Sequence, residues 1–453
     1  MHYREICIIR KYFSFWYMYS LRQASLERLY DFAFRALIVF LPFYTFFTVF
    51  FHEKLGIPGI SFLKEIFLFL MFFIVLFFHA SGRKRIIWTK YDVLIGVYII
   101  VMGIVTLFTT GIPGLIYGGR YDFAFLLAFF TIFHGIGFLD RPISFYVKLF
   151  VVSWGVMLII STLLKWPLSE DLLLYAGYCG NPSNWQSCGW IPPVFHGIDG
   201  ANVRRFQGIL DGPNTMAAYL IIYIGLFLYY FRNKKDWYFV LGTVTLLLSA
   251  LLFYTYSRSS VVGLFAWVWF IILFSLRYIF THYRIQAITL TLVFFLVLGT
   301  LFIQYAGTLP AILGRGWSTQ GHAERMHIGI ARFLSHPLGQ WLASAGPAYR
   351  YIIPFDTKTP AEKENLDKQY IPESWYIQQL IEWGIFGFIT FITLLWALLL
   401  WVYRRYIIIA GAFVGILTMN LFLHTFESSL VSLTIFLVLW LLLAPSTRTH
   451  ERK

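Results

Sequence analysis

Long apolar runs separated by short polar breaks make up most of this chain, and LVFFLVLGTLFI at residues 292–303 is typical of them. Roughly 17–25 consecutive apolar residues allow an α-helix to cross a bilayer. Membrane-spanning β-strands are shorter and alternate in polarity, so uninterrupted runs fit helices. The sequence therefore predicts an all-α polytopic membrane protein that forms a single integral membrane domain over residues 1–453. Twelve spans are predicted, at 33–51, 60–80, 91–110, 122–138, 143–164, 213–231, 237–256, 259–277, 286–305, 374–402, 404–423 and 427–444.

Composition and charge placement exclude the ordinary soluble classes. Hydrophobic residues make up 59% of the chain and charged residues 13%, whereas about a quarter of the residues in a soluble protein are charged. The net charge of +14 would fit a nucleic-acid-binding protein, but the basic residues are concentrated in alternate breaks between spans. We therefore expect membrane lipids, and no nucleic acid, as partners.

The basic residues predict the orientation of the chain. They cluster at both ends of the chain and in every second break, at 83–90, 141, 232–235, 277–284 and 404–405. Basic residues favour the cytoplasmic side of short loops. Twelve spans with both termini in the cytoplasm satisfy this rule at every break. The expected location is the cytoplasmic membrane, with no cleaved leader, because the N-terminal stretch lacks a short apolar core followed by a cleavage site.

Two long polar segments, 165–212 and 306–373, are then extracytoplasmic. The second joins spans nine and ten, and we expect it to be partly helical, because HAERMHIGIARFLSHPLG has apolar residues near helical spacing before Pro337. The extracytoplasmic position of the first segment permits a disulfide between Cys179 and Cys188. Two unpaired thiols are the alternative.

The less expected charged residues also belong to the outer breaks. Arg258, in YSRSSVVGL, lies in a break of about three residues and therefore close to the hydrocarbon edge. Such an arginine faces a polar cavity or a partner, or it reaches lipid headgroups. Guanidinium groups bind phosphate oxygens in two-pronged fashion, so several of them beside a membrane suit a lipid-linked pyrophosphate. The other candidates of this kind are Arg120, Arg204, Arg205 and Arg325.

The stretch VRRFQGILDGPNTMAAYL, residues 203–220, leads into the sixth span. We expect one of its two arginines, Arg204 or Arg205, to bind phosphate, with Asn214 nearby. Asp211 is expected to cap the helix that begins at Pro213, since both residue types suit a helix start.

The acid–base candidates are Glu373 and His322. Glu373 opens PESWYIQQLIEWGIFGF and is a candidate general base, although a carboxylate there also interacts favourably with the helix dipole. Glu382 should face the interior of the bundle. The five- and nine-residue spacings of the histidines in HAERMHIGIARFLSHPLG do not place them on one helical face, and no Asp-x-Asp pair occurs. We predict no metal and no other cofactor.

The order of these motifs resembles that of the O-antigen ligase/polymerase superfamily of bacterial membrane glycosyltransferases. FQGILDGPNTMAAYL, YSRSS, ERMHIGIARFLSHPLG and YIQQLIEWGIFGF follow one another over roughly residues 115–390. The resemblance implies transfer of a glycan from an undecaprenyl-pyrophosphate carrier to an acceptor hydroxyl of a lipid, a glycan or a protein, outside the cytoplasmic membrane. It also implies inversion at the anomeric carbon without a metal or a nucleotide sugar.

The matching positions give roles to individual residues. Arg258 and one of Arg204 and Arg205 would hold the pyrophosphate, and Arg325 would contact phosphate or glycan. Better-known members carry a histidine, commonly His-Asn, where this chain has Glu373 followed by a serine, so the resemblance leaves the identity of the base open.

A transporter or a flippase for lipid-linked glycans is the alternative function. Transporters tend to contain internal repeats and broken helices around a midplane site, whereas the polar residues of this chain belong mainly to the outer breaks and no repeat is present. Ligase and polymerase share a donor and differ in the acceptor, which the sequence does not specify.

The predicted orientation can be tested with reporter fusions that end at Val203, Ser257 and Asn233. We expect fusions at Val203 and Ser257 to report an extracytoplasmic position and the fusion at Asn233 to report a cytoplasmic one, because basic residues surround it. Opposite positions for Val203 and Ser257 would exclude a shared anion site.

Overall fold

The computed structural model describes residues 25–57, 59–82, 88–180, 191–198, 201–233, 238–275, 316–353, 357–426 and 428–443. These residues are mostly helical. The strands among them form one antiparallel hairpin, β1 (Gly197–Ile198) and β2 (Ala201–Arg204).

Six helices in the described residues are long and apolar enough to cross a membrane, and a bent pair adds a seventh. The six are Ser25–Leu55, Ile60–Ala80, α4 (Lys90–Thr109), α7 (Ile143–Lys165), α8 (Pro213–Phe231) and α15 (Trp375–Tyr403). The first includes η1 (Leu41–Phe43) and α2 (Tyr44–Leu55), and the second includes η2 (Ile60–Phe62) and α3 (Leu63–Ala80). The bent pair joins α5 (Gly111–Asp122) to α6 (Ala124–Gly135) and η3 (Ile136–Phe138) at an angle of 59°. Shorter apolar helices are α9 (Tyr238–Tyr254), α10 (Arg258–Ser275), α16 (Ile407–Met419) and α17 (Ser429–Leu443).

The expectation of a mostly helical chain with several apolar helices suited to a membrane is confirmed. Every predicted span except 286–305 overlaps one of these helices. Residues 286–305 lie outside the described part, and the count of twelve remains a prediction. One predicted break differs, because residues 111–121 are not an irregular connection but belong to α5.

The outward-facing surfaces of the helices are apolar. Phe108 on α4 is 84% exposed and Leu246 on α9 is 73% exposed, and further large apolar side chains are exposed along α3, α7 and α15. Apolar surface on this scale is unsuited to water and marks contact with another apolar phase. Lipid tails supply that phase in a bilayer.

Small residues let the central helices approach closely. α10 packs on α16 where a methyl group on Gly263 would lie 2.7 Å from the carbonyl oxygen of Gly415. α8 contacts both helices, and α17 is buried along its length. Close backbone approach through small residues is a usual way for membrane helices to associate.

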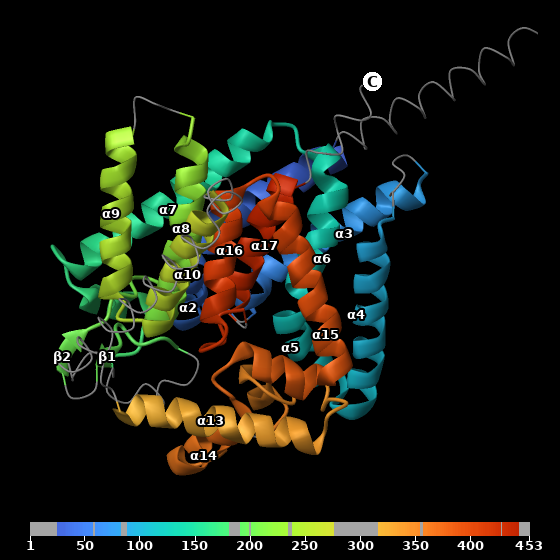
Figure 1. The fold of residues 1–453 in the computed structure, drawn as a ribbon, viewed down its shortest axis with the longest axis vertical. Coiled ribbons are helices and arrows are strands. Elements are labelled where there is room, and N and C mark those ends of the chain that lie inside the picture. Colours follow the sequence, from blue (N-terminus) through green and yellow to red (C-terminus); the bar gives the residue numbers. More distant parts are fainter. Residues whose placement is uncertain are drawn as a thin grey trace, which may run out of the picture.

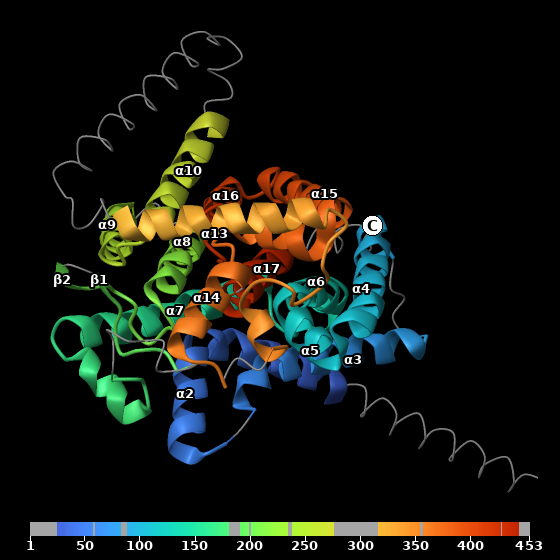
Figure 2. The same cartoon turned by 90° about the horizontal axis from the view of Figure 1, so that it is seen from below.

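The described parts of the two long polar segments, 165–212 and 306–373, lie at one end of these helices. Helix α13 (Gly316–Ser335) and helix α14 (Pro360–Tyr370) lie across this end, next to the hairpin (Figure 1). Seen from below, α13 runs from the side of α9 toward α15 (Figure 2). Helix α13 ends before Pro337, so the predicted helix in segment 306–373 is confirmed. Cys179 is part of a disulfide, and its predicted partner Cys188 lies outside the described residues.

A break in α15 provides backbone hydrogen-bonding groups that bind the segment after α13 to the apolar helices. Gly384 has φ 65° inside the helix, a left-handed conformation that suits glycine. The chain that follows α13 hydrogen-bonds to the freed backbone: the amides of Gln340 and Trp341 donate to the carbonyls of Ile381 and Glu382, at 2.7 and 2.9 Å. The break therefore creates no unsatisfied backbone groups at these positions.

The packing of α10 on α16 predicts a difference between two glycine-to-alanine variants. Gly263→Ala should lower the free energy of unfolding by about 1–3 kcal/mol, because the added methyl group overpacks the contact with Gly415. Gly242→Ala on α9 is the matched control, since nothing lies within 4 Å of its methyl position. Thermal unfolding in detergent measures both; equal stability of the two variants would contradict the close contact.

Candidate active site

The end of the helices at which α13 lies holds most of the candidate residues, beginning with Arg205. Its Nε donates to the carbonyl of Thr255 at 2.9 Å, and its Nη2 donates to Oδ1 of Asn214 at 3.0 Å. The backbone amide of Phe206 also donates to the carbonyl of Tyr254 at 2.9 Å. Arg205 is thereby held against the three-residue turn that leads into Arg258.

That turn is short and conformationally restrained. It runs from Thr255 to Ser257 and has the expected length, but Arg258, which we expected within the break, is the first residue of α10. Tyr256 has φ 49°, a left-handed conformation that is uncommon outside glycine. Ser260 Oγ donates to the Ser257 carbonyl at 2.7 Å. Strained residues of this kind persist where the surroundings fix them, and they cluster at functional sites.

Arg204 occupies a different environment. Its Nη1 lies 3.7 Å from Oδ1 of Asp171 and 4.0 Å from Oε2 of Glu170, and its side chain is 46% exposed. Its guanidinium carbon lies 3.9 Å from the centre of the Phe195 ring. Of the two neighbouring arginines, the structure places Arg205 beside Asn214 and the Arg258 turn, and places Arg204 in a peripheral ion pair.

The start of α8 corrects one prediction. Gly212, not Asp211, is the N-cap residue, and Pro213 occupies the first turn as expected. The Asp211 side chain hydrogen-bonds to Thr215 instead. The cap position moves by one residue because the extended backbone continues through Gly212, whose φ is −176°.

Arg120 belongs to a buried charge cluster on α2, η2, α3 and α5. Its Nε donates to Glu65 Oε1 at 2.8 Å, and its Nη2 donates to the Tyr44 hydroxyl and the Ser61 carbonyl, both at 2.7 Å. Lys64 Nζ lies 2.8 Å from the same Glu65 oxygen. Arg120 thus has protein partners where we predicted a substrate phosphate.

Glu373 lies in the connection between α14 and α15 and contacts two residues of α13. Arg325 Nη1 donates to its Oε1 at 2.6 Å, and His322 Nδ1 lies 3.1 Å from its Oε2. Burial alone would raise the pKa of Glu373, but the hydrogen bond from His322 and the neighbouring positive charges outweigh it and lower the pKa to about 2. Glu373 also has φ 47°, so its backbone is held in a strained conformation.

His424 is a neighbour of this group that the sequence analysis did not select. It lies between α16 and α17, and its Nδ1 is 3.0 Å from Oε1 of Gln378. Burial lowers the pKa of His424 to about 4; the negative charge of Glu373 opposes this shift and the positive charge of Arg325 adds to it. His424 is therefore neutral at pH 7. The polar stretch HTFESS after predicted span eleven was the available signal.

The residues around Arg258 and those around Glu373 both lie close to the C-terminal end of α16. The amide of Trp375, two residues after Glu373, donates to the carbonyls of Asn420 and Leu423 at 3.1 and 3.3 Å. The methyl position of Gly263, five residues after Arg258, is 2.9 Å from Met419 Cγ. The Glu373 connection and the first turns of α10 therefore both pack near residues 419–423.

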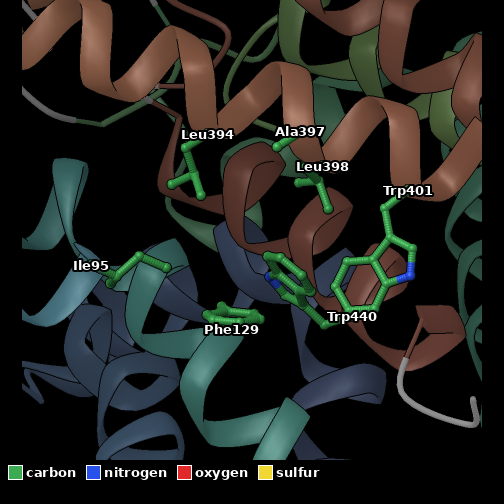
Figure 3. Close-up of a pocket in the computed structure, with 7 residues that line it drawn as sticks. All are labelled: Ile95, Phe129, Leu394, Ala397, Leu398, Trp401 and Trp440. Carbon is green, nitrogen blue, oxygen red and sulfur yellow. The ribbon is translucent and has the colours of Figure 1, made fainter. Parts of the chain in front are cut away.

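An apolar cavity elsewhere in the bundle does not contribute to this site. Its lining residues come from α4, α6, α15 and α17, and they are Ile95, Phe129, Leu394, Ala397, Leu398, Trp401 and Trp440 (Figure 3). It lies toward the opposite end of α15 from Glu373. Within the part of the chain that the structure describes, no group of three or more His, Cys, Asp or Glu residues is placed to hold a metal ion.

Comparison with known proteins does not identify a family. No family model matches the chain, and no curated protein matches it.

The charge cluster around Glu65 predicts that Glu65→Gln destabilises the protein more than Arg120→Gln. Loss of Glu65 leaves two buried cations side by side, at a cost of about 3–5 kcal/mol, whereas loss of Arg120 leaves the Lys64–Glu65 pair intact. Thermal unfolding of both variants in detergent makes the comparison. A stable but inactive Arg120→Gln protein would instead indicate that Arg120 binds substrate.

Proposed function

We propose that the protein is a metal-independent, inverting glycosyltransferase. Its donor is a glycan on an undecaprenyl-pyrophosphate carrier, and its acceptor is the hydroxyl of a lipid, a glycan or a protein. The observation that carries the proposal is the contact of Arg205 with the turn that leads into Arg258. It brings residues from two separate chain segments to the end of the bundle where Glu373, His322 and Arg325 also lie.

The departure of the pyrophosphate leaving group requires positive charge beside it. When an acceptor oxygen attacks the anomeric carbon, the bond to the pyrophosphate breaks and negative charge develops on the departing phosphate oxygen. Fixed guanidinium groups at that point stabilise the transition state more than the ground state. Arg205 is partly preorganised for this role, because Thr255 and Asn214 orient its guanidinium group.

The position of the site suits a lipid-borne donor. A polyprenyl carrier diffuses within the bilayer, so its pyrophosphate reaches the protein at the membrane surface. Arg258 begins an apolar helix and Arg205 lies just before α8, which places both at the boundary between apolar and polar surroundings. In the proposed orientation this end faces the outside of a bacterial cytoplasmic membrane, with twelve spans and both termini in the cytoplasm.

A transporter or flippase is the second candidate function, and two observations favour it. The α5–α6 pair is bent by 59°, and α15 is broken at Gly384. Two buried carboxyl groups, Asp122 on α5 and Glu382 on α15, lie within hydrogen-bonding reach of one another between these elements. Broken helices with buried charge are typical of transport sites. In this candidate, transport would depend on Asp122 and Glu382 rather than on Arg205.

The proposed function predicts different effects for two adjacent arginines. Arg205→Ala should reduce glycan transfer at least about 100-fold, the scale seen when one transition-state donor is removed, while Arg204→Ala should retain most activity because Arg204 lies in an exposed ion pair. Both variants are expressed in a strain that lacks the gene, and the surface glycans are profiled.

The glycan profile also separates the possible reactions. Single units attached to the acceptor indicate loss of a polymerase, and long chains that remain on the carrier indicate loss of a ligase. Equal activity of the two variants would contradict phosphate binding by Arg205. Failure of carrier-linked glycan to reach the outer face would favour the flippase.

A further inference from the structure

Both carboxylate oxygens of Glu373 are engaged by protein groups. Arg325 occupies Oε1 at 2.6 Å and His322 occupies Oε2 at 3.1 Å. The Glu373 side chain is 17% exposed, whereas that of His322 is 35% exposed. A general base must reach the proton that it removes and must be able to hold it. Glu373 is ionised at neutral pH, but its pKa of about 2 makes it a weak proton acceptor.

The same contact prepares His322 for that task. Its Nδ1 faces the carboxylate, so Nδ1 carries the hydrogen of this bond and the neutral ring keeps its lone pair on Nε2. A carboxylate on one ring nitrogen fixes the tautomer and the ring orientation, and it stabilises the imidazolium that forms when the other nitrogen takes a proton.

We infer that His322 removes the proton from the acceptor hydroxyl and that Glu373 is the positioning residue that orients it. The inference rests on the proposed function and identifies the base within it. As the acceptor O–H bond breaks, its proton moves to Nε2 of His322. The acceptor oxygen forms the new bond to the anomeric carbon, and the electron pair of the old bond leaves on the pyrophosphate oxygen. The imidazolium then releases the proton to water.

The other charged neighbours are compatible with this role. Arg325, three residues after His322 on α13, neutralises one oxygen of Glu373 and so keeps the carboxylate ionised and fixed. His424, from the α16–α17 connection, is neutral because burial lowers its pKa to about 4, and it is engaged with Gln378. His424 therefore adds no positive charge beside His322 at neutral pH.

The test measures transfer by the full-length protein in liposomes, with carrier-linked glycan extracted from the producing strain and its native acceptor fraction. His322→Ala should lower the rate at least about 100-fold, the lower range for loss of a general base, and added imidazole should restore part of it. His327→Ala is the matched control, since His327 is exposed on the same helix, and it should retain activity.

The pH profile distinguishes a base from a structural residue. The wild-type rate should fall as the pH is lowered from 8 to 5, the range in which imidazole bases take up a proton. Glu373 remains ionised over this whole range. Glu373→Gln should lower the rate, because the His322 ring loses the carboxylate that orients it.

Three results would overturn the inference. The first is a His322→Ala protein that is active. The second is a His322→Ala protein that unfolds at the wild-type temperature but whose lost transfer activity is not restored by imidazole. The third is a wild-type transfer rate that is constant between pH 5 and 8. A wild-type protein that transfers no glycan would overturn the proposed function itself, so the two failures are distinguishable.

Discussion

The break in α15 at Gly384 joins the segment that follows α13 to the apolar helices. Inside a membrane the backbone groups freed by such a break must find partners in the protein, because lipid offers none. The segment after α13 supplies them: its amides bond to the carbonyls just before the break, and the amide of Ile385 donates to the Pro337 carbonyl at 3.0 Å. These bonds tie the end of α13 to α15, and the contacts of Glu373 with Arg325 and His322 join the same two elements closer to the start of α15.

Charge balance explains why similar arginines have different environments. Arg120 and Lys64 share one carboxylate in a buried cluster, so their charges are largely neutralised where a ligand would be costly to admit. Arg205 is oriented by an amide and a backbone carbonyl, neither of which carries a formal charge. The Arg120 guanidinium is therefore fixed by a charged partner, whereas these two contacts of Arg205 are with uncharged groups.

Much of the helical framework could be predicted from sequence, because lipid imposes a simple rule of length and polarity on each span. The existence of a short turn beside Arg258 and the end of α13 before Pro337 followed from the same local patterns, although Arg258 itself begins α10. The choice between Arg204 and Arg205 could not, because it depends on a hydrogen bond to Thr255, which lies 50 residues away along the chain. The bend between α5 and α6 was also missed, since residues 111–121 were left between two predicted spans where the structure has a helix.

The pairing of His322 with Glu373 shows why a sequence motif is an incomplete guide to chemistry. Glu373 was selected because it opens a helix, and His322 was named separately as an acid–base candidate, but nothing in the sequence placed them in contact. The structure brings α13 across the start of α15, and a methyl group on Gly329 would meet Pro372 Cβ at 2.6 Å. This close approach requires a small residue on α13 one turn beyond Arg325. The acid–base function proposed for the pair therefore depends on a packing contact made by a glycine that carries no chemistry of its own.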